Sequence, residues 1–169
     1  MATPQFILDL REKIGHSPLW LMGITAVVRD EQGRYLLGRR ADTGEWAFTY
    51  GIVEPAEEPA ITAIREVKEE TGLDVEVTAL VAVTSSSRML TYANGDKAQY
   101  MDHMFEARLA PDSSHLASTP DGENLNSRWF AQECFPDNLA ASTKERLALY
   151  KRWLAQGEDL SHRPALFRS

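Results

Sequence analysis

The feature that most constrains this chain is the stretch 51–73, which reads GIVEPAEEPAITAIREVKEETGL. Pro59 suits the first turn of a helix, where the N–H that proline lacks would have no helical partner anyway. Gly72 suits the residue after a helix, because glycine adopts the left-handed conformation that ends many helices. The stretch therefore predicts a helix over 59–71, preceded by a polar loop that starts at Gly51.

The two sides of this predicted helix differ in chemistry. Residues that recur with the helical rotation of about 100° per residue share one side. The apolar side then carries Ala60, Ile61, Ala63, Ile64, Val67 and Thr71. The opposite, outward side carries three glutamates, Glu66, Glu69 and Glu70. Lys68 falls at the edge of the apolar side and is expected to extend outward.

The three glutamates have two interpretations. They can form a solvated face with salt bridges to Arg65 and Lys68, as charge runs usually do. Alternatively, carboxylates spaced three and four residues apart converge, and hard oxygen ligands suit Mg²⁺ or Mn²⁺. Such a cation can bridge phosphate oxygens and activate a water. The solvated interpretation gives no use to Gly51 or to Glu57, eight residues before Arg65, so the metal interpretation is favoured.

Length and charge narrow the class of protein. With 169 residues, the chain is expected to fold as one domain. Its net charge of −7, with scattered basic residues, argues against a nucleic-acid polymer as partner. The single cysteine excludes an internal disulfide. There is no pattern of a secretory signal, and no apolar run approaches the roughly 18–20 residues of a membrane span. We therefore expect a cytoplasmic protein without membrane contact.

Patterns elsewhere predict a mixture of strands and helices. The expected elements are a short helix over 5–14, a hairpin over 21–39, a strand at 46–50, a strand at 75–87, a hairpin over 88–108, a polar loop at 111–122, a strand at 127–131, a terminal helix opened by a capping box at Ser142 and Glu145, and a loose tail from Arg163. Such a mixture indicates an α/β sheet with helices on its faces.

The stretch also resembles a known family. Residues 51–73 match the Nudix hydrolase signature, G-x5-E-x7-R-E-U-x-E-E-x-G-U with U aliphatic, at every fixed position. The matching residues are Gly51, Glu57, Arg65, Glu66, Val67, Glu69, Glu70, Gly72 and Leu73. The resemblance covers roughly residues 20–155, within a single domain spanning 1–169.

The resemblance implies a fold and an activity. Nudix proteins have an α/β/α sandwich with a mixed β-sheet, in which the signature forms a loop, a helix and a loop. They hydrolyse nucleoside diphosphates linked to another group, by water attack at phosphorus, with Mg²⁺ or Mn²⁺. The substrate expected here is a nucleotide-type diphosphate, and family members are commonly monomers or homodimers.

The resemblance also implies roles for particular residues. Glu66, Glu69 and Glu70 match the family's metal-binding glutamates, and the carbonyl of Tyr50, which precedes Gly51, matches a further metal ligand. Glu57 and Arg65 match a pair that braces the loop against the helix, while Gly51 and Gly72 are structural. The catalytic base is expected among Glu70, Glu66 and Glu123, with Glu70 preferred. Asp121 competes with Glu123 for its position.

Substrate contacts are expected outside the signature. Arg39 and Arg40 suit phosphate oxygens, and Trp46 suits stacking on a base. The alternative places Trp46 in the core and both arginines on the surface. Base recognition is expected from the loops at 41–46 and 111–122.

Two departures from the family pattern bear on the metal site. The family often has Gly-Gly where this chain has Tyr50-Gly51, and glycine where it has Ala56. Backbone strain is therefore expected at Tyr50 if that position needs a glycine conformation. Two other functions stay open: a Nudix-fold nucleotide sensor that binds without turnover, and a scaffold that binds a partner through the hairpin at 88–108.

Overall fold

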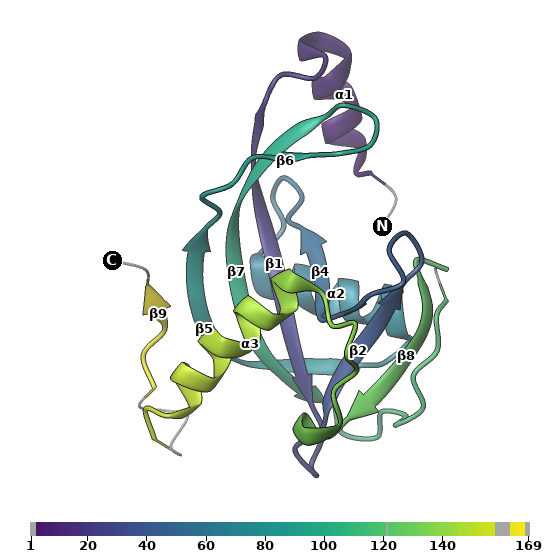
Figure 1. Cartoon of the computed structure of the whole chain (residues 1–169), viewed down its shortest axis with the longest axis vertical. Helices are drawn as coiled ribbons and strands as arrows, with labels where there is room; N and C mark the ends of the chain where they lie inside the picture. Colours follow the sequence, from purple (N-terminus) through teal and green to yellow (C-terminus); the bar gives the residue numbers. More distant parts are fainter. Residues whose placement is uncertain (1–2, 121, 158–162, 168–169) are drawn as a thin grey trace.

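The computed structural model describes residues 3–120, 122–157 and 163–167. Its elements are arranged around one curved sheet (Figure 1). In chain order they are α1 (Gln5–Ile14), β1 (Leu19–Arg29), β2 (Tyr35–Arg40), β3 (Trp46–Ala47), β4 (Thr49–Ile52), α2 (Pro59–Thr71), β5 (Val75–Ser85), β6 (Leu90–Thr91), β7 (Lys97–Leu109), β8 (Asn124–Phe130), the short 3-10 helix η1 (Gln132–Cys134), α3 (Ala141–Leu154) and β9 (Leu166–Phe167).

The sheet is mixed, and β1 lies at its centre. β1 runs parallel to β7 and antiparallel to β4. The strand order is β3-β2-β1-β7-β5-β9, with β4, β6 and β8 paired to β1, β7 and β2 respectively. Residues 23–28 of β1 are all buried, as expected of an apolar strand covered on both faces.

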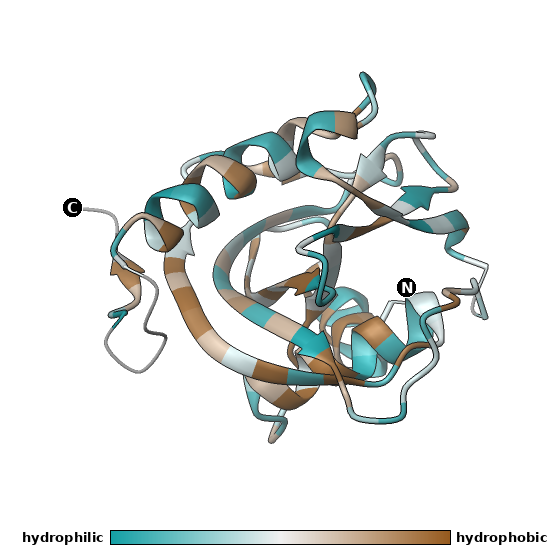
Figure 2. Cartoon of the chain, turned by 90° about the horizontal axis from the view of Figure 1, so that it is seen from below, coloured by the Kyte–Doolittle hydropathy of each residue, from teal (hydrophilic) through white to brown (hydrophobic). Residues whose placement is uncertain are grey.

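Helices cover both faces of the sheet. One core cluster, which includes Val27 and Phe48, packs under α3 through Tyr150 and Trp153. A second cluster, which includes Ile24, packs under α2. α3 crosses in front of the sheet in Figure 1 and α2 lies behind it, and hydrophobic segments recur along the bent long strands (Figure 2). The predicted α/β/α sandwich with a mixed sheet is confirmed. None of the helices that the structure describes is long and apolar enough to cross a membrane.

The helix predicted over 59–71 is confirmed by α2, and Gly72 follows it with a φ of 72°. The predicted division of its sides is wrong at two residues. Ile61 is 55% exposed, whereas Glu66 is only 1% exposed. Helical spacing fixes the angles between residues but not which arc meets the sheet, and here α2 turns Glu66 onto β4.

The hairpin predicted over 21–39 is confirmed only at its turn. β1 and β2 pair at Arg29 and Tyr35, and the strands then separate. The reason is that β7 and β4 take the two edges of β1, whereas β2 pairs with β3 and β8.

Two predictions about the C-terminal region are wrong. α3 begins after Ala140, and no side chain caps it. Ser142 lies instead near the phenol of Tyr50, at 3.2 Å between the two oxygens. The chain beyond Arg163 is not a loose tail throughout, because β9 pairs with β5 in parallel.

Candidate active site

The centre of the candidate site is the contact between Gly51 and Glu66. Gly51 lies in β4, directly under the side chain of Glu66 from α2. A Cβ atom added to Gly51 would lie 2.3 Å from the Cγ of Glu66. The glycine therefore leaves the space in which a carboxylate is buried at 1% exposure, and any larger residue would displace it.

Arg65 joins three carboxylates around this contact. Its Nε and Nη2 donate to the two carboxylate oxygens of Glu57, at 2.8 and 3.0 Å. Its Nη1 donates to Glu66 at 3.0 Å and to Glu69 at 3.1 Å. Paired bonds of this kind are strong and directional. Because Glu57 lies in the loop and Arg65 in α2, they tie the loop to the helix.

The same guanidinium leaves the acids in different electrostatic states. Burial raises the pKa of Glu66 to about 7, and the charge of Arg65 opposes that rise only in part. Hydrogen bonds from Arg65 lower the pKa of Glu57 to about 2. Glu57 is therefore held as a carboxylate, whereas burial disfavours a charge on Glu66.

Glu70 is the last of the three α2 glutamates, and its neighbours come from β8 and β2. The amide Nδ2 of Asn124 donates to Glu70 Oε2 at 3.2 Å. The pKa of Arg40 is raised, chiefly by its hydrogen bonds to Asp42 and also by the charge of Glu70. Sequence reasoning missed Asn124, although it follows Glu123 directly. The one available signal was Gly38 within β2, because a glycine inside a strand often marks a close approach.

Tyr50 has its backbone beside the candidate site and its ring on the other face of the sheet. Its hydroxyl lies 2.8 Å from Thr143 Oγ1, and the guanidinium of Arg146 lies 4.9 Å from its ring centre. The strain expected at Tyr50 is absent, because Tyr50 lies in β4 without a positive φ. A positive φ, of 68°, occurs instead at Ala56, the other position where this chain lacks the glycine common in the family.

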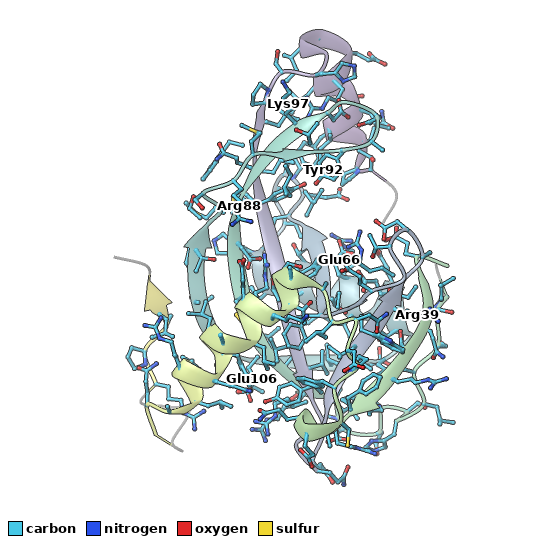
Figure 3. The ribbon with its side chains drawn as sticks, in the orientation of Figure 1. Arg39, Glu66, Arg88, Tyr92, Lys97 and Glu106 are labelled. Carbon is cyan, nitrogen blue, oxygen red and sulfur yellow. The ribbon has the colours of Figure 1, made fainter. Side chains whose placement is uncertain are left out.

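The residues predicted to contact substrate are not all near α2. Arg39 donates to the carbonyl of Gly44 at 3.2 Å, and it lies further out than Glu66 in Figure 3. Trp46 is 9% exposed and packs edge-on against Phe130, with ring centres 4.9 Å apart. Little of the indole face is open for stacking, so the packing favours the core alternative for Trp46.

Glu123 and Asp121 are the two candidates for an additional carboxylate beyond the signature, and only Glu123 lies within the described residues. Glu123 is partly buried just before β8, and its carbonyl accepts a hydrogen bond from the N–H of Ala41 at 2.9 Å. This places it one residue from Asn124, the partner of Glu70. Asp121 lies outside the described residues.

The three glutamates of α2 make hydrogen bonds to two different side chains. Arg65 holds Glu66 and Glu69, whereas Asn124 holds Glu70. Within the described ranges, no three acidic, histidine or cysteine side chains are gathered as a metal site. Glu66 and Glu69 do converge on one nitrogen, Nη1 of Arg65.

The chemistry of the donor set nevertheless fits a hard divalent cation. The donors are carboxylate oxygens within about one helical turn, and Mg²⁺ and Mn²⁺ prefer oxygen ligands. Glu66 occupies a space that a single Cβ at Gly51 would fill. Its burial makes an unneutralised charge costly. The residues present therefore suit a cation at this end of β4.

A cavity of about 310 Å³ lies on the α3 side of the sheet. Its lining comes from β5 and the turn after it, from β7 and from α3, and includes Ser86, Arg88, Tyr100, Asp102 and Arg146. The loops at 41–46 and 111–122, expected to recognise the base, supply none of its lining. No sequence signal could have found this cavity, because three separated segments form it.

Comparison with known proteins bears on this arrangement. The family model described as the NUDIX domain matches residues 20–152. A putative 8-oxo-dGTP diphosphatase of Bacillus subtilis (strain 168) is 32% identical over 133 residues, which cover 79% of this chain and 81% of the relative. A MutT-like protein of Streptomyces ambofaciens is 46% identical over 66 residues, which cover 39% of this chain and 43% of the relative. An 8-oxo-dGDP phosphatase of Mus musculus is 27% identical, and the match covers 83% of this chain but only 39% of the relative. The chain thus spans less than half the length of these last two relatives.

Solved structures show the same fold. An ADP-ribose pyrophosphatase from Streptococcus suis 89-1591 matches with a TM-score of 0.65 and 23% identity, covering 88% of this chain and 98% of that one. A UDP-X diphosphatase matches with a TM-score of 0.67 and 22% identity, covering 96% of this chain and 74% of that one. The NUDIX domain match covers most of the chain, and the fold agrees with it. This chain therefore belongs to the Nudix family.

Proposed function

We propose that this chain hydrolyses a nucleoside diphosphate linked to another group, with a divalent cation, by water attack at phosphorus. Relatives that are named as diphosphatases, phosphatases and pyrophosphatases of nucleotide compounds support the reaction class. The proposed substrate is a nucleotide-type diphosphate. A cytoplasmic location and a monomeric or homodimeric state stay predictions.

The observation that carries the proposal is the burial of Glu66 against Gly51. A buried carboxylate is usually matched by a dedicated cation or a full set of donors. Here the donor is Arg65, which Glu57 and Glu69 also share. A purely structural helix gains nothing from this crowding of negative charge, whereas a cation-binding helix needs it.

The proposed ligands are Glu66, Glu69 and Glu70 with the carbonyl of Tyr50, and the cation is Mg²⁺ or Mn²⁺. The chemistry that such a cation supplies when bound is neutralisation of phosphate charge and activation of water. Glu57 and Arg65 keep the loop against α2 through their paired hydrogen bonds. Gly51 keeps room for Glu66, and Gly72 ends α2.

The proton of the attacking water goes to a carboxylate oxygen. We assign this role to Glu70, ahead of Glu66 and Glu123. Glu70 borders β8 and β2, where Arg40 lies within its electrostatic reach. As the new bond from water to phosphorus forms, the bond from phosphorus to the bridging oxygen breaks. Two phosphate-bearing fragments leave.

Arg40 is the better candidate of the two arginines for a phosphate contact. It feels the charge of Glu70, whereas Arg39 is turned to the backbone of Gly44. Its bidentate ion pair with Asp42 is exposed, with an Nε–Oδ1 distance of 2.9 Å and an Nη2–Oδ2 distance of 2.5 Å. Because both side chains are exposed, a phosphate can reach the guanidinium of Arg40 and compete with Asp42 for it.

A substrate panel tests the proposal. Nucleoside triphosphates, dinucleoside polyphosphates and nucleotide sugars are incubated with the protein and Mg²⁺ or Mn²⁺, and the products are identified by mass. We expect two phosphate-bearing products from at least one class, and none when the cation is chelated. Tight nucleotide binding with no product over hours would instead establish the sensor alternative.

Two variants connect this activity to α2. Glu69→Gln and Glu70→Gln each remove a charge from the acidic group and are expected to lower the rate by about a hundredfold or more, as loss of a ligand or base does. Glu58→Gln is the matched control, because Glu58 is exposed at the start of the same helix. Full activity in both test variants would refute the proposal.

A further inference from the structure

We propose that Asn124 is a positioning residue that orients Glu70, and that Gly38 provides the space in which Asn124 does so. The inference rests on the proposed function, because it assigns a task to the surroundings of the proposed base. Neither residue belongs to the signature at 51–73. Both lie in the paired strands β2 and β8, outside α2.

A bulge between these strands turns Asn124 toward α2. Arg39 pairs with Asn126, but the next residue, Arg40, pairs with Asn124. Leu125 is therefore the extra residue, and it is 59% exposed. An inserted residue re-aims the side chains beyond it, because side chains alternate between faces with a period of two. In unbroken pairing Leu125 would oppose Arg40, and Asn124 would point to the other face.

Gly38 completes the arrangement because it has no side chain. A Cβ atom added there would lie 2.6 Å from Asn124 Nδ2, and its three nearest heavy atoms all belong to the Asn124 amide. Gly38 has no positive φ, so its backbone does not need glycine. The requirement for glycine at this position is therefore the space taken by Asn124.

The held amide reaches the proposed base. Asn124 is 6% exposed, and its Nδ2 lies 3.2 Å from Glu70 Oε2. A buried amide with packed neighbours has few alternative rotamers, so the donor is fixed in place. As a neutral donor, it orients the carboxylate and leaves its negative charge for a cation or a proton. Arg65 plays a different part, since it adds positive charge to the acids that it contacts.

The test is a double-mutant cycle of Gly38→Ala and Asn124→Ala, with Asn126→Ala as the matched control on the same strand. Mg²⁺ affinity is measured by calorimetry. The values of kcat and KM are measured with the best substrate of the panel, and the melting temperature is measured on cation-free protein. We expect Asn124→Ala to lower kcat and Mg²⁺ affinity about tenfold, as loss of an outer partner of a ligand does, with KM nearly unchanged. Asn126→Ala should change neither.

Gly38→Ala is expected to lower kcat and Mg²⁺ affinity in the same way, because its added methyl group displaces the Asn124 amide. The double variant should then be no worse than Asn124→Ala alone. The inference would be overturned if the losses of kcat and Mg²⁺ affinity in the two single variants added up in the double variant. It would also be overturned if Asn124→Ala kept both values within twofold of the parent. If Asn124→Ala melts too early to be assayed, Gly38→Ala carries the test, and unchanged kcat and affinity there overturn it.

The outcomes separate this inference from the proposed function. If the parent protein turns over no substrate, the proposed function fails. The Mg²⁺ affinities and melting temperatures of the single and double variants then still show whether the effects of Asn124 and Gly38 on the α2 glutamates are coupled. If the parent is active and Glu70→Gln is not, but the cycle shows no coupling, only the role of Asn124 fails.

Discussion

The two faces of the sheet each carry a buried carboxylate, and the two are satisfied differently. On the α3 face, Asp102 is 6% exposed and receives hydrogen bonds from Thr25 at 2.9 and 3.1 Å and from Arg146 at 3.0 Å. On the α2 face, Glu66 is 1% exposed and, within the described chain, receives one hydrogen bond, from Arg65 at 3.0 Å.

The difference lies in where the arginines come from and how many acids they serve. Arg146 reaches from α3 to Thr25 and Asp102 in the sheet, so it joins two layers. Arg65 belongs to the same helix as Glu66, and its donors are shared with other carboxylates. Asp102 is therefore fully hydrogen-bonded within a network, whereas Glu66 shares its donor with Glu69. Two acids of similar burial thus differ in how completely their partners satisfy them.

The largest effect on the free energy of unfolding is expected when the variants Asp102→Asn and Glu66→Gln are compared. Asp102→Asn leaves the charge of Arg146 without its partner and should cost about 3 kcal/mol of unfolding free energy. Glu66→Gln leaves Arg65 paired with Glu57 and Glu69 and replaces a carboxylate whose charge burial disfavours, so it should change the unfolding free energy by less than about 1 kcal/mol. Urea denaturation of the cation-free proteins measures both. Equal losses would show that the two carboxylates are equally structural.

A smaller effect is expected from Gly51→Ala, which tests whether Glu66 needs the space above β4. The new Cβ would lie 2.3 Å from Glu66 Cγ, and overpacking of this kind costs about 2 kcal/mol. The loss should be largely recovered in the double variant Gly51→Ala, Glu66→Ala, compared with Glu66→Ala alone. Denaturation curves that show the same cost in both backgrounds would locate the clash elsewhere.

The smallest effect concerns the loop that joins β4 to α2. Ala56 has a φ of 68°, a conformation that costs a residue with a side chain about 1 kcal/mol. Ala56→Gly should therefore raise the unfolding free energy by up to that amount. Asp112→Gly is the control, because Asp112 has a similar φ of 64° but aspartate tolerates it better. A smaller gain at 56 than at 112 would argue against strain in this loop.

Much of α2 could be predicted from the sequence, because its signals are local. Pro59 and Gly72 bound a helix whose ends the structure reproduces. The burial of Glu66 and the exposure of Ile61 could not be predicted. Both depend on the rotation of α2 about its axis, which the packing of β4 and β1 against it decides.

The surroundings of the site were harder to predict than the helix. Asn124 meets Glu70 only because a bulge in β8 shifts its pairing with β2, and nothing in the residues near 124 announces a bulge. Trp46 looked suited to stacking, yet the neighbouring Phe130 holds it in the core. Such contacts join segments that are far apart in the chain.

The sequence by itself determined the spacing of the acids along α2, the family and the class of fold, because helix geometry converts a spacing of three or four residues into proximity. Only the tertiary structure decided that Glu66 is buried against Gly51 and that Arg65 serves three carboxylates. It alone brought Asn124 to Glu70. The physical reason is that the pairing of strands and the rotation of a helix follow from long-range packing, which no local pattern encodes.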